Sequence, residues 1–464
     1  MRYEKLTPTH IDSLRAILDP ARVHVGEAIS EDYSHDELAY DRLYPDVLVE
    51  PISTMEVAQV LRFSYQHHIP IVPRGTGTGL CGGAVALHGG IMLSMARMNR
   101  ILEIDQDNRM AVVEPGVILL EFQKTVEEMG LFYPPDPGEK SATLGGNVMT
   151  NAGGMRAVRY GVTRDYVLGM EAVIPGGEII HLGGKVLKNS SGYSLKDLLI
   201  GSEGTLAVVT KLILKLLPRP LRQVSLLVPF PDLDQAIDAV PRIMGASIIP
   251  TAIEFMQREV IQAAEKYLGK PFPDSSAPAY LLLAFYGNSI EELTAVHHQA
   301  AHVCLASGAL DVLIADTQER QEMIWEARGA FLEALKGMSE IDEVDVVVPP
   351  AKVAQFIKFT RAIAQDLGAR ILSFGHAGDG NIHVYILRDG RPQDEWRILL
   401  GEAMDRMYRE ARDLEGQVSG EHGIGLAKIP YLQASLGDAE LHLLRGIKQV
   451  FDPKGLLNPG KVVR

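Results

Sequence analysis

The sequence predicts a protein of the mixed α+β class with more than one domain. Its 464 residues exceed the ~250 residues at which one hydrophobic core stops growing. Helical and strand-like apolar patterns alternate along the chain. Its 44 glycines gather in a few regions instead of being spread evenly. We therefore expect two or three domains, each with its own core, together with long glycine-rich loops.

The first half predicts a succession of short helices and strands. Leu14, Ile17 and Leu18 have the spacing of a helix. The elements that follow are a strand at 45–52, a helix at 56–68 capped by Ser53 or Thr54, a buried strand at 69–75, a hairpin at 101–116 and a helix at 117–130. Between residues 160 and 218 the pattern indicates strands and turns, with the clearest turn at Pro175–Gly177.

A domain boundary is expected where Pro218 and Pro220 interrupt an apolar run. Beyond it, strands are predicted at 224–230, 252–255 and 280–285, and helices at 233–244 (capped by Asp232), 291–307, 321–335 and 396–414. This alternation favours an antiparallel sheet with helices on one face.

Composition excludes several classes of protein. The 45 Lys and Arg against 59 Asp and Glu give a net charge of −14, and no basic run occurs, so neither nucleic acid nor an anionic membrane is an expected partner. Two cysteines can form neither a disulfide framework nor a four-thiolate iron–sulfur site. With no signal-like N-terminus and no membrane-spanning run, we expect a cytoplasmic protein.

Three glycine-rich segments stand out as candidate phosphate-binding loops. The first, Arg74–Gly79 (RGTGTG), follows a buried strand, yet its glycine spacing differs from a dinucleotide-binding G-x-G-x-x-G and it lacks a Walker lysine. The others are the long stretch from Pro135 to Gly154 and IGSEGTL at 200–206. Long loops inside a compact domain are usually functional, although a purely structural turn is the alternative for the first one.

Together, PRGTGTGL, PPDPGE, TLGGNVMTNAGG, YGVTRDYV and IGSEGTLAVVT resemble the FAD-binding domain of the vanillyl-alcohol-oxidase/p-cresol-methylhydroxylase (PCMH) type across residues 40–219. The resemblance implies FAD bound without a covalent link, because Thr78 stands where covalently linked members often carry histidine. The residues that it assigns to FAD binding are Pro73, Arg74, Gly75, Thr76, Gly77, Thr78, Gly79, Pro137, Gly138, Thr143, Gly145, Gly146, Asn147, Asn151, Gly153, Gly154, Tyr160, Glu203, Gly204 and Asn458.

Two histidines flank a predicted hairpin turn in GHAGDGNIH. If residues 378–381 form the turn, His376 pairs directly with His383 on one face, a spacing that suits two ligands of one metal ion. SGEHGIG at 419–425 offers a further carboxylate and imidazole, Glu421 and His422. The alternative is that both segments are ordinary turns.

These two motifs, with LNPGK near the C-terminus, resemble the C-terminal domain of FAD-linked oxidases such as D-lactate and D-2-hydroxy-acid dehydrogenases and the glycolate oxidase flavin subunit. The resemblance implies a two-subdomain PCMH-type FAD-binding domain (40–219) after a helical segment (1–39). It also implies an α+β cap domain with a ferredoxin-like antiparallel sheet (220–415) and a helical C-terminal segment returning to the flavin (416–464). It makes His376, His383 and Glu421 ligands of a divalent zinc, manganese or iron ion, and His422 the catalytic base.

The same resemblance assigns the substrate carboxylate to Arg328 and places Tyr385 at the substrate. Apolar or bulky Leu332 and Tyr385, where a D-2-hydroxyglutarate branch carries polar residues, favour a small acid. We expect oxidation of D-lactate to pyruvate; glycolate or D-2-hydroxyglutarate dehydrogenase and a non-catalytic flavin subunit are the alternatives. An alkyl-dihydroxyacetone-phosphate synthase fits less well, because the chain is acidic. An electron-transfer flavoprotein or iron–sulfur subunit is the expected electron acceptor.

Overall fold

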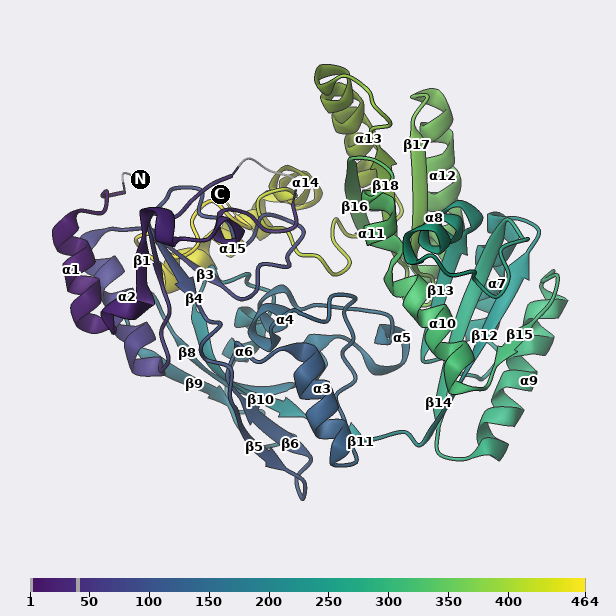
Figure 1. Cartoon of the computed structure of the whole chain (residues 1–464), viewed down its shortest axis with the longest axis horizontal. Coiled ribbons are helices and arrows are strands. Elements are labelled where there is room, and N and C mark those ends of the chain that lie inside the picture. The colour runs from purple at the N-terminus through teal and green to yellow at the C-terminus, as the bar shows by residue number, and fades with distance from the viewer. Residues whose placement is uncertain (1–2, 39–41, 464) are drawn as a thin grey trace. The chain divides into compact units, whose positions relative to one another are not determined.

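The computed structural model describes residues 3–38 and 42–463, and their contacts divide the chain into two compact units (Figure 1). The first unit contains the chain up to Gly153, then Val162–Arg219, then the chain from Glu421 onward. The second unit contains Gly154–Gly161 and Pro220–Gly420. Among the described residues, no helix has the length and apolar character needed to cross a membrane.

A four-stranded sheet in the order β1-β2-β4-β3 forms one part of the first unit. Its strands are β1 (Val23–Val25), β2 (Val47–Val49), β3 (Ile71–Arg74) and β4 (Ile91–Ser94). The helices α1 (Pro8–Ile17) and α2 (Thr54–His67) share a buried aliphatic core with this sheet. Ser53 caps α2 as predicted, because its hydroxyl accepts a hydrogen bond from Glu56 N at 3.3 Å.

A five-stranded antiparallel sheet, β5-β6-β10-β8-β9, forms the other part of the first unit. Its strands are β5 (Ile101–Asp105), β6 (Met110–Val113), β8 (Val167–Val173), β9 (Ile179–Gly183) and β10 (Val208–Lys215). The predicted hairpin at 101–116 and the turn at Pro175–Gly177 are confirmed by β5–β6 and β8–β9. The remaining elements are β7 (Leu131–Phe132), β11 (Leu217–Pro218), α3 (Leu119–Glu128), α4 (Leu144–Thr150), α6 (Leu195–Leu199), α14 (Ile429–Ser435) and α15 (Asp438–Phe451).

The prediction of a continuous loop from Pro135 to Gly154 was wrong in its second half, which contains α4. Glycine has a low helix propensity, so the glycines at positions 145 and 146 make this helix hard to predict from the sequence. Thr143 begins it by accepting a hydrogen bond from Gly146 N at 3.2 Å. Tertiary contacts therefore outweigh the poor helix propensity of glycine here.

The second unit is built on a seven-stranded antiparallel sheet, β15-β12-β14-β13-β17-β18-β16. Its strands are β12 (Arg222–Phe230), β13 (Ala252–Gln257), β14 (Ala279–Gly287), β15 (Leu313–Ala315), β16 (Ile341–Val347), β17 (Arg370–His376) and β18 (Asn381–Leu387). Its helices are α5 (Ala157–Tyr160), α7 (Leu233–Met244), α8 (Arg258–Leu268), α9 (Ile290–Ala306), α10 (Gln318–Gly329), α11 (Phe331–Lys336), α12 (Val353–Asp366) and α13 (Gln393–Asp413). Short 3₁₀ turns complete the chain at Pro20–Arg22, Gly26–Ala28, Glu31–Ser34, Thr163–Tyr166 and Pro350–Lys352.

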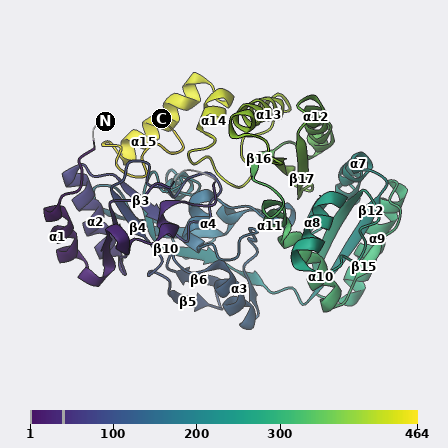
Figure 2. The same cartoon turned by 45° about the horizontal axis from the view of Figure 1, so that its top comes forward.

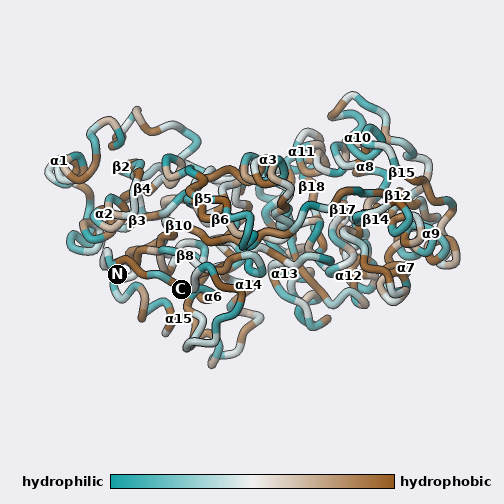
Figure 3. The backbone as a smooth tube through the Cα atoms, turned by 90° about the horizontal axis from the view of Figure 1, so that it is seen from below, coloured by the Kyte–Doolittle hydropathy of each residue, from teal (hydrophilic) through white to brown (hydrophobic). Residues whose placement is uncertain are grey.

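Helices cover both faces of this sheet, so the prediction of helices on one face was wrong. Every residue of β12 from Val224 to Phe230 is buried, and successive side chains of a strand point to opposite faces. The helices α8, α10 and α11 share a core with Leu227 and Leu282, while α7 and α9 contact β12 and β14 from the other side (Figure 2). The continuous apolar runs of β12 and β14, visible as hydrophobic stretches in Figure 3, carry this two-sided burial.

Candidate functional site

The first glycine loop follows β3 directly, and two of its glycines have no room for a side chain. A Cβ added to Gly75 would clash with the Thr143 hydroxyl, and one added to Gly77 would clash with the Arg74 guanidinium. Gly77 has a φ of +83°, which favours glycine. Glycine at these two positions therefore lets the backbone approach Thr143 and the Arg74 side chain closely.

The Arg74 side chain holds this loop from within. Its Nη2 donates to Asp32 O at 2.6 Å, its Nη1 donates to Ala84 O at 3.2 Å, and the guanidinium lies 5.5 Å from the centre of the Tyr33 ring. Burial of the whole residue, 5% exposed, fixes these contacts. The structure thus gives the Arg74 guanidinium a role in shaping the loop, beside the predicted contact of this residue with a cofactor.

The segment from Glu421 onward packs against the third glycine segment and against residues 82–85. Glu203 accepts hydrogen bonds from Ile424 N and Gly425 N, both at 2.7 Å. Asn458 Nδ2 donates to Gly83 O and Glu203 O, and Lys461 Nζ donates to Gly82 O and Val85 O. The C-terminal LNPGK motif therefore acts as a buried clasp on the loop that follows the first glycine segment.

Glu421 lies beside the second glycine segment. A Cβ added to Gly153 would lie 2.8 Å from Glu421 Oε2, so glycine at this position makes space for the carboxylate. The Glu421 Oε1 and His422 Nε2 atoms are 3.7 Å apart. The structure thus brings the Glu-His pair of the SGEHGIG motif to the predicted flavin-binding loops of the first unit.

The residues of the first unit fit a polar cofactor that supplies missing hydrogen bonds. Asn147 Nδ2, Asn458 Oδ1 and Asp36 Oδ2 are buried atoms without a hydrogen-bond partner among the described residues. Burial raises the pKa of Asp36, although the Leu38 amide and Lys461 oppose that effect. Buried polar groups usually have hydrogen-bond partners, so buried polar atoms without one near glycine loops indicate a bound ligand. Gly154 and Tyr160, predicted with the same set, belong to the second unit.

In the second unit, the register of the GHAGDGNIH hairpin differs from the prediction. His376 pairs with Asn381, and His383 pairs with Phe374, because the turn contains residues 377–380 instead of 378–381. Gly380 permits this turn with a φ of +86°. The two histidines are therefore diagonal neighbours on one face, and their rings lie edge to face with centres 5.3 Å apart.

A buried carboxylate that sequence reasoning missed lies beside His376. Glu254 on β13 pairs in register with His376, and its Oε1 lies 2.7 Å from His376 Nδ1. Its Oε2 accepts hydrogen bonds from Arg328 Nε and Nη2 at 2.9 and 2.6 Å. Burial alone would raise the pKa of Glu254, but the charges and hydrogen bonds of His376 and Arg328 outweigh it and lower that pKa.

Arg328 is placed over this sheet by a break between two helices. The predicted helix at 321–335 divides into α10 and α11 around Gly329–Ala330, and Arg328 occupies the last turn of α10. Its guanidinium lies 4.7 Å from the Phe374 ring centre. The hydrogen bonds that Arg328 makes to the described residues use its Nε–Nη2 edge, so its Nη1–Nη2 end is the part suited to a second carboxylate.

Two further acids that the sequence analysis missed stand beside His383 on β16. Glu343 Oε1 lies 3.1 Å from His383 Nδ1 and accepts a hydrogen bond from the Tyr385 hydroxyl at 2.9 Å. Asp345 accepts hydrogen bonds from Asn381 Nδ2, Ser419 Oγ and Gly420 N. The alternation Glu343, Val344, Asp345 was the available signal, since two acids separated by one apolar residue share one face of a strand.

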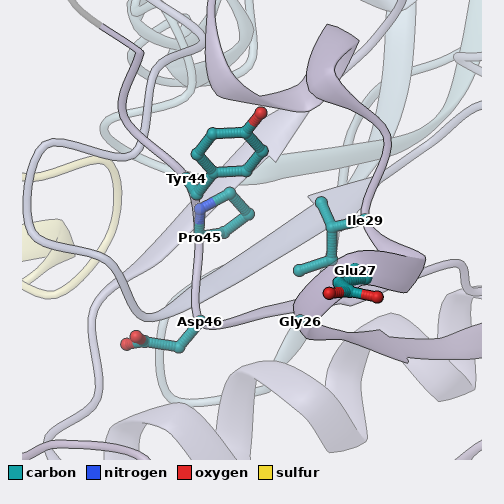
Figure 4. Close-up of a pocket in the computed structure, with 6 residues that line it drawn as sticks. All are labelled: Gly26, Glu27, Ile29, Tyr44, Pro45 and Asp46. Carbon is teal, nitrogen blue, oxygen red and sulfur yellow. The ribbon is translucent and has the colours of Figure 1, made fainter.

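A surface depression in the first unit is separate from all predicted site residues. It has a volume of about 690 Å³ and is lined by Gly26, Glu27, Ile29, Tyr44, Pro45 and Asp46 (Figure 4). None of these residues was predicted to bind a cofactor, metal or substrate. We assign it no role.

Comparison with known proteins decides the family. Residues 45–183 match the FAD binding domain family, and residues 219–462 match the C-terminal domain of FAD linked oxidases. The chain belongs to the FAD-linked oxidase family. It is therefore a FAD-dependent oxidoreductase, as its sequence motifs predicted.

Relatives of this FAD-linked oxidase span nearly the whole chain. It is 47% identical to a D-lactate dehydrogenase of Anaerostipes hadrus, over 99% of this chain and 98% of the relative. It is 40% identical to the glycolate oxidase subunit GlcD of Bacillus subtilis strain 168, over 93% and 91%. The solved structure of p-cresol methylhydroxylase with substrate bound matches with a TM-score of 0.80 at 18% identity, covering 98% of this chain and 96% of that one, which confirms the predicted PCMH-type fold.

Proposed function

We propose that this chain oxidises D-lactate to pyruvate and transfers the electrons to FAD. The observation that carries the proposal is the buried Arg328–Glu254–His376 group next to His383, in a chain 47% identical to a D-lactate dehydrogenase. A guanidinium with one end available suits the planar carboxylate of a hydroxy acid. FAD supplies the acceptor of the hydride that leaves C2 of the substrate.

His376, His383 and Glu421 are proposed to hold a divalent zinc, manganese or iron ion. Support comes from two carboxylates: Glu254 Oε1 lies 2.7 Å from His376 Nδ1, and Glu343 Oε1 lies 3.1 Å from His383 Nδ1. Metal-binding histidines usually donate the N–H of the other ring nitrogen to such groups. Glu421 follows Gly420 by one peptide bond, and Gly420 N is hydrogen-bonded to Asp345. A metal bound there would lower the pKa of the substrate hydroxyl by polarising it.

In the proposed reaction, Arg328 binds the substrate carboxylate and His422 accepts the proton of the 2-hydroxyl group as C2 loses its hydride. Holding the carboxylate at one point and the hydroxyl at another presents one face of C2, which selects one enantiomer. For the cofactor, we keep the predicted loop residues from Pro73 to Gly79 and from Pro137 to Gly154, with Tyr160, Glu203, Gly204 and Asn458. We propose that FAD is held there without a covalent link.

The surroundings of Arg328 favour a small substrate. Tyr385 is buried, stacks on Phe374 and donates to Glu343, and its pKa is raised well above the usual value, so it is a neutral donor. Leu332 packs against the apolar core of the second unit. Neither side chain offers a positive charge to a second substrate carboxylate, which favours lactate over 2-hydroxyglutarate.

We propose that the reduced flavin passes its electrons to a partner protein, either an electron-transfer flavoprotein or an iron–sulfur subunit. The chain has two cysteines, both buried and neither in a disulfide bond, which cannot hold a four-thiolate cluster. Thiols outside disulfide bonds also support the proposed cytoplasmic location. Rapid turnover of the isolated protein with oxygen as the sole acceptor would contradict the need for a partner.

The proposal is tested by anaerobic reduction of the purified protein. D-lactate is expected to bleach the flavin absorbance, whereas L-lactate and D-2-hydroxyglutarate are expected to do so at least 100-fold more slowly. Glycolate is included because of the similarity to a glycolate oxidase subunit. If glycolate bleaches the flavin absorbance faster than D-lactate does, glycolate is the substrate instead of D-lactate. If none of the four acids bleaches the flavin, the proposed dehydrogenase function is wrong.

Variants test the proposed roles separately. His376→Ala is expected to lose the metal, as measured by elemental analysis of the purified protein, while it keeps the flavin spectrum. His422→Gln is expected to keep both metal and flavin but to lower the rate of flavin reduction by about 10²–10⁴-fold. His298→Ala, a substitution of an exposed histidine on α9, serves as the control for both measurements.

A further inference from the structure

Glu254 is a buried carboxylate that touches two groups with different proposed tasks. Its side chain is 0% exposed, and it lies on β13 in register with His376 on β17. One oxygen, Oε1, lies 2.7 Å from His376 Nδ1. The other oxygen, Oε2, accepts both hydrogen bonds of the Arg328 Nε–Nη2 edge.

We propose that Glu254 is a positioning residue that couples the metal ligand His376 to the substrate-binding residue Arg328. The inference rests on the proposed function, because it takes His376 as a metal ligand and Arg328 as the binder of the substrate carboxylate. It goes beyond that function by making one carboxylate responsible for the orientation of both groups.

The effect on His376 follows from the chemistry of an ionised carboxylate. A carboxylate only accepts hydrogen bonds, so the contact requires the ring proton on Nδ1 and leaves the Nε2 lone pair for a metal ion. The ring cannot turn over without losing this hydrogen bond. Glu254 thus selects the tautomer and the ring orientation that a metal ligand needs.

The effect on Arg328 is geometric. Both Glu254 hydrogen bonds fall on one edge of the guanidinium, which also lies 4.7 and 5.6 Å from the ring centres of Phe374 and Phe331. These contacts fix the plane of the guanidinium group and direct its Nη1–Nη2 end away from Glu254. A movement of Glu254 would therefore disturb metal binding and substrate binding together.

Glu254→Gln separates this role from general stability. A carboxamide cannot accept hydrogen bonds at both ends, so its NH₂ group must face either His376 Nδ1 or Arg328. We expect the Kd for Co²⁺, measured by competition with a chromogenic chelator, to rise 10- to 100-fold. We also expect the KM for D-lactate to rise at least 10-fold in metal-saturated protein, with kcat affected less.

The matched control is Glu114→Gln, which makes the same chemical change at a buried glutamate paired with Arg100 in the first unit. It is expected to lower the melting temperature without changing the Kd for Co²⁺ or the KM. Glu254→Asp keeps the charge but is one methylene shorter. It is expected to raise both constants less than Glu254→Gln does, and it replaces that variant if Glu254→Gln does not fold.

A wild-type Kd for Co²⁺ and a wild-type KM in the Glu254 variants, with only a lower melting temperature, would overturn the inference. A rise in one constant alone would overturn the coupling as well. Failure of the proposed function looks different, because the wild-type protein itself would then bind no Co²⁺ or show no flavin reduction by D-lactate.

Discussion

At the scale of single residues, Asp345 organises the region before the Glu-His pair. Its Oδ2 accepts hydrogen bonds from Ser419 Oγ at 2.8 Å and from Gly420 N at 3.1 Å, and its Oδ1 accepts one from Asn381 Nδ2 at 2.8 Å. Gly420 has no room for a side chain, since an added Cβ would clash with the Asn381 amide. The start of the SGEHGIG motif is thus held by one carboxylate on β16.

Asp345→Asn is expected to lower the free energy of unfolding by about 2 kcal/mol, because a buried acceptor of three hydrogen bonds becomes partly a donor. Urea unfolding followed by circular dichroism measures the loss. Asp366→Asn serves as the control, since Asp366 forms an exposed ion pair with Arg406 that should contribute within about 0.5 kcal/mol. Equal stability of the two variants would contradict this account of Asp345.

Lys461 provides a pH-dependent prediction. Burial lowers its pKa to about 8, although Asp36 and Glu203 oppose the effect, whereas the ordinary value is 10.5. Between pH 8 and pH 10.5 the unfolded chain binds more protons at this residue than the folded chain does. The free energy of unfolding therefore rises with pH in this window as far as Lys461 is concerned.

We expect the free energy of unfolding of the wild type, relative to that of Lys461→Met, to increase by about 3 kcal/mol from below pH 8 to pH 10.5. Taking the difference between the two proteins removes the contributions of other groups that titrate in this pH range. Urea unfolding of both proteins at saturating FAD measures it. A difference that stays constant with pH would show that Lys461 keeps its ordinary pKa in the folded protein.

At the scale of elements, the β17–β18 hairpin depends on Gly380. Its φ of +86° and the clash that a Cβ would have with Val348 O leave room for glycine alone. The sequence predicted the hairpin and the shared face of His376 and His383. It did not predict the register, because GHAGDGNIH contains glycines on both sides of Asp379 and allows two turn positions.

Gly380→Ala is expected to destabilise the protein by more than 2 kcal/mol, because it adds backbone strain and displaces Val348. Gly390→Ala is the matched control: Gly390 has a φ of +75°, but an added Cβ would meet no atom within 4 Å. The control should cost about 1 kcal/mol from strain alone. Thermal unfolding of both variants tests whether the close approach to Val348 adds to the strain.

At the scale of the whole molecule, the chain returns to its first unit after completing the second. Asn458, 1% exposed with a φ of +43°, and Lys461, 2% exposed, make four hydrogen bonds to the backbone carbonyls of Gly82, Gly83, Val85 and Glu203. The predicted division into four segments, at 39/40, 219/220 and 415/416, stays a prediction. The contacts show that the first unit needs residues from both ends of the chain.

Truncation after Leu457 is expected to raise the Kd for FAD at least 10-fold, since the truncated chain loses the clasp on the Gly82–Val85 loop. Each lost hydrogen bond should contribute about 1 kcal/mol, so the melting temperature should fall as well. Fluorescence titration of deflavinated protein with FAD measures the affinity. Deletion of Arg464 alone is the control, and equal FAD affinity of both truncations would contradict the role of the clasp.

The sequence by itself determined the family, the glycine loops and the identity of the residues that we propose for catalysis. These features depend on short motifs, such as SGEHGIG, in which residues close together in the sequence identify the feature. The helix cap at Ser53 was predicted from neighbouring residues in the same way. Local periodicity likewise predicted most helices and both confirmed hairpins of the first unit.

Only the tertiary structure decided which distant residues support these motifs. Glu254 is separated from His376 by more than 100 residues, yet the pairing of β13 with β17 places them 2.7 Å apart. Strand order, the register of the hairpin and the packing of helices on both faces of the sheet arise from contacts between segments far apart in the chain. A pattern of neighbouring residues carries no information on these contacts, because burial of an isolated acid such as Glu254 depends on the partners that the fold brings to it.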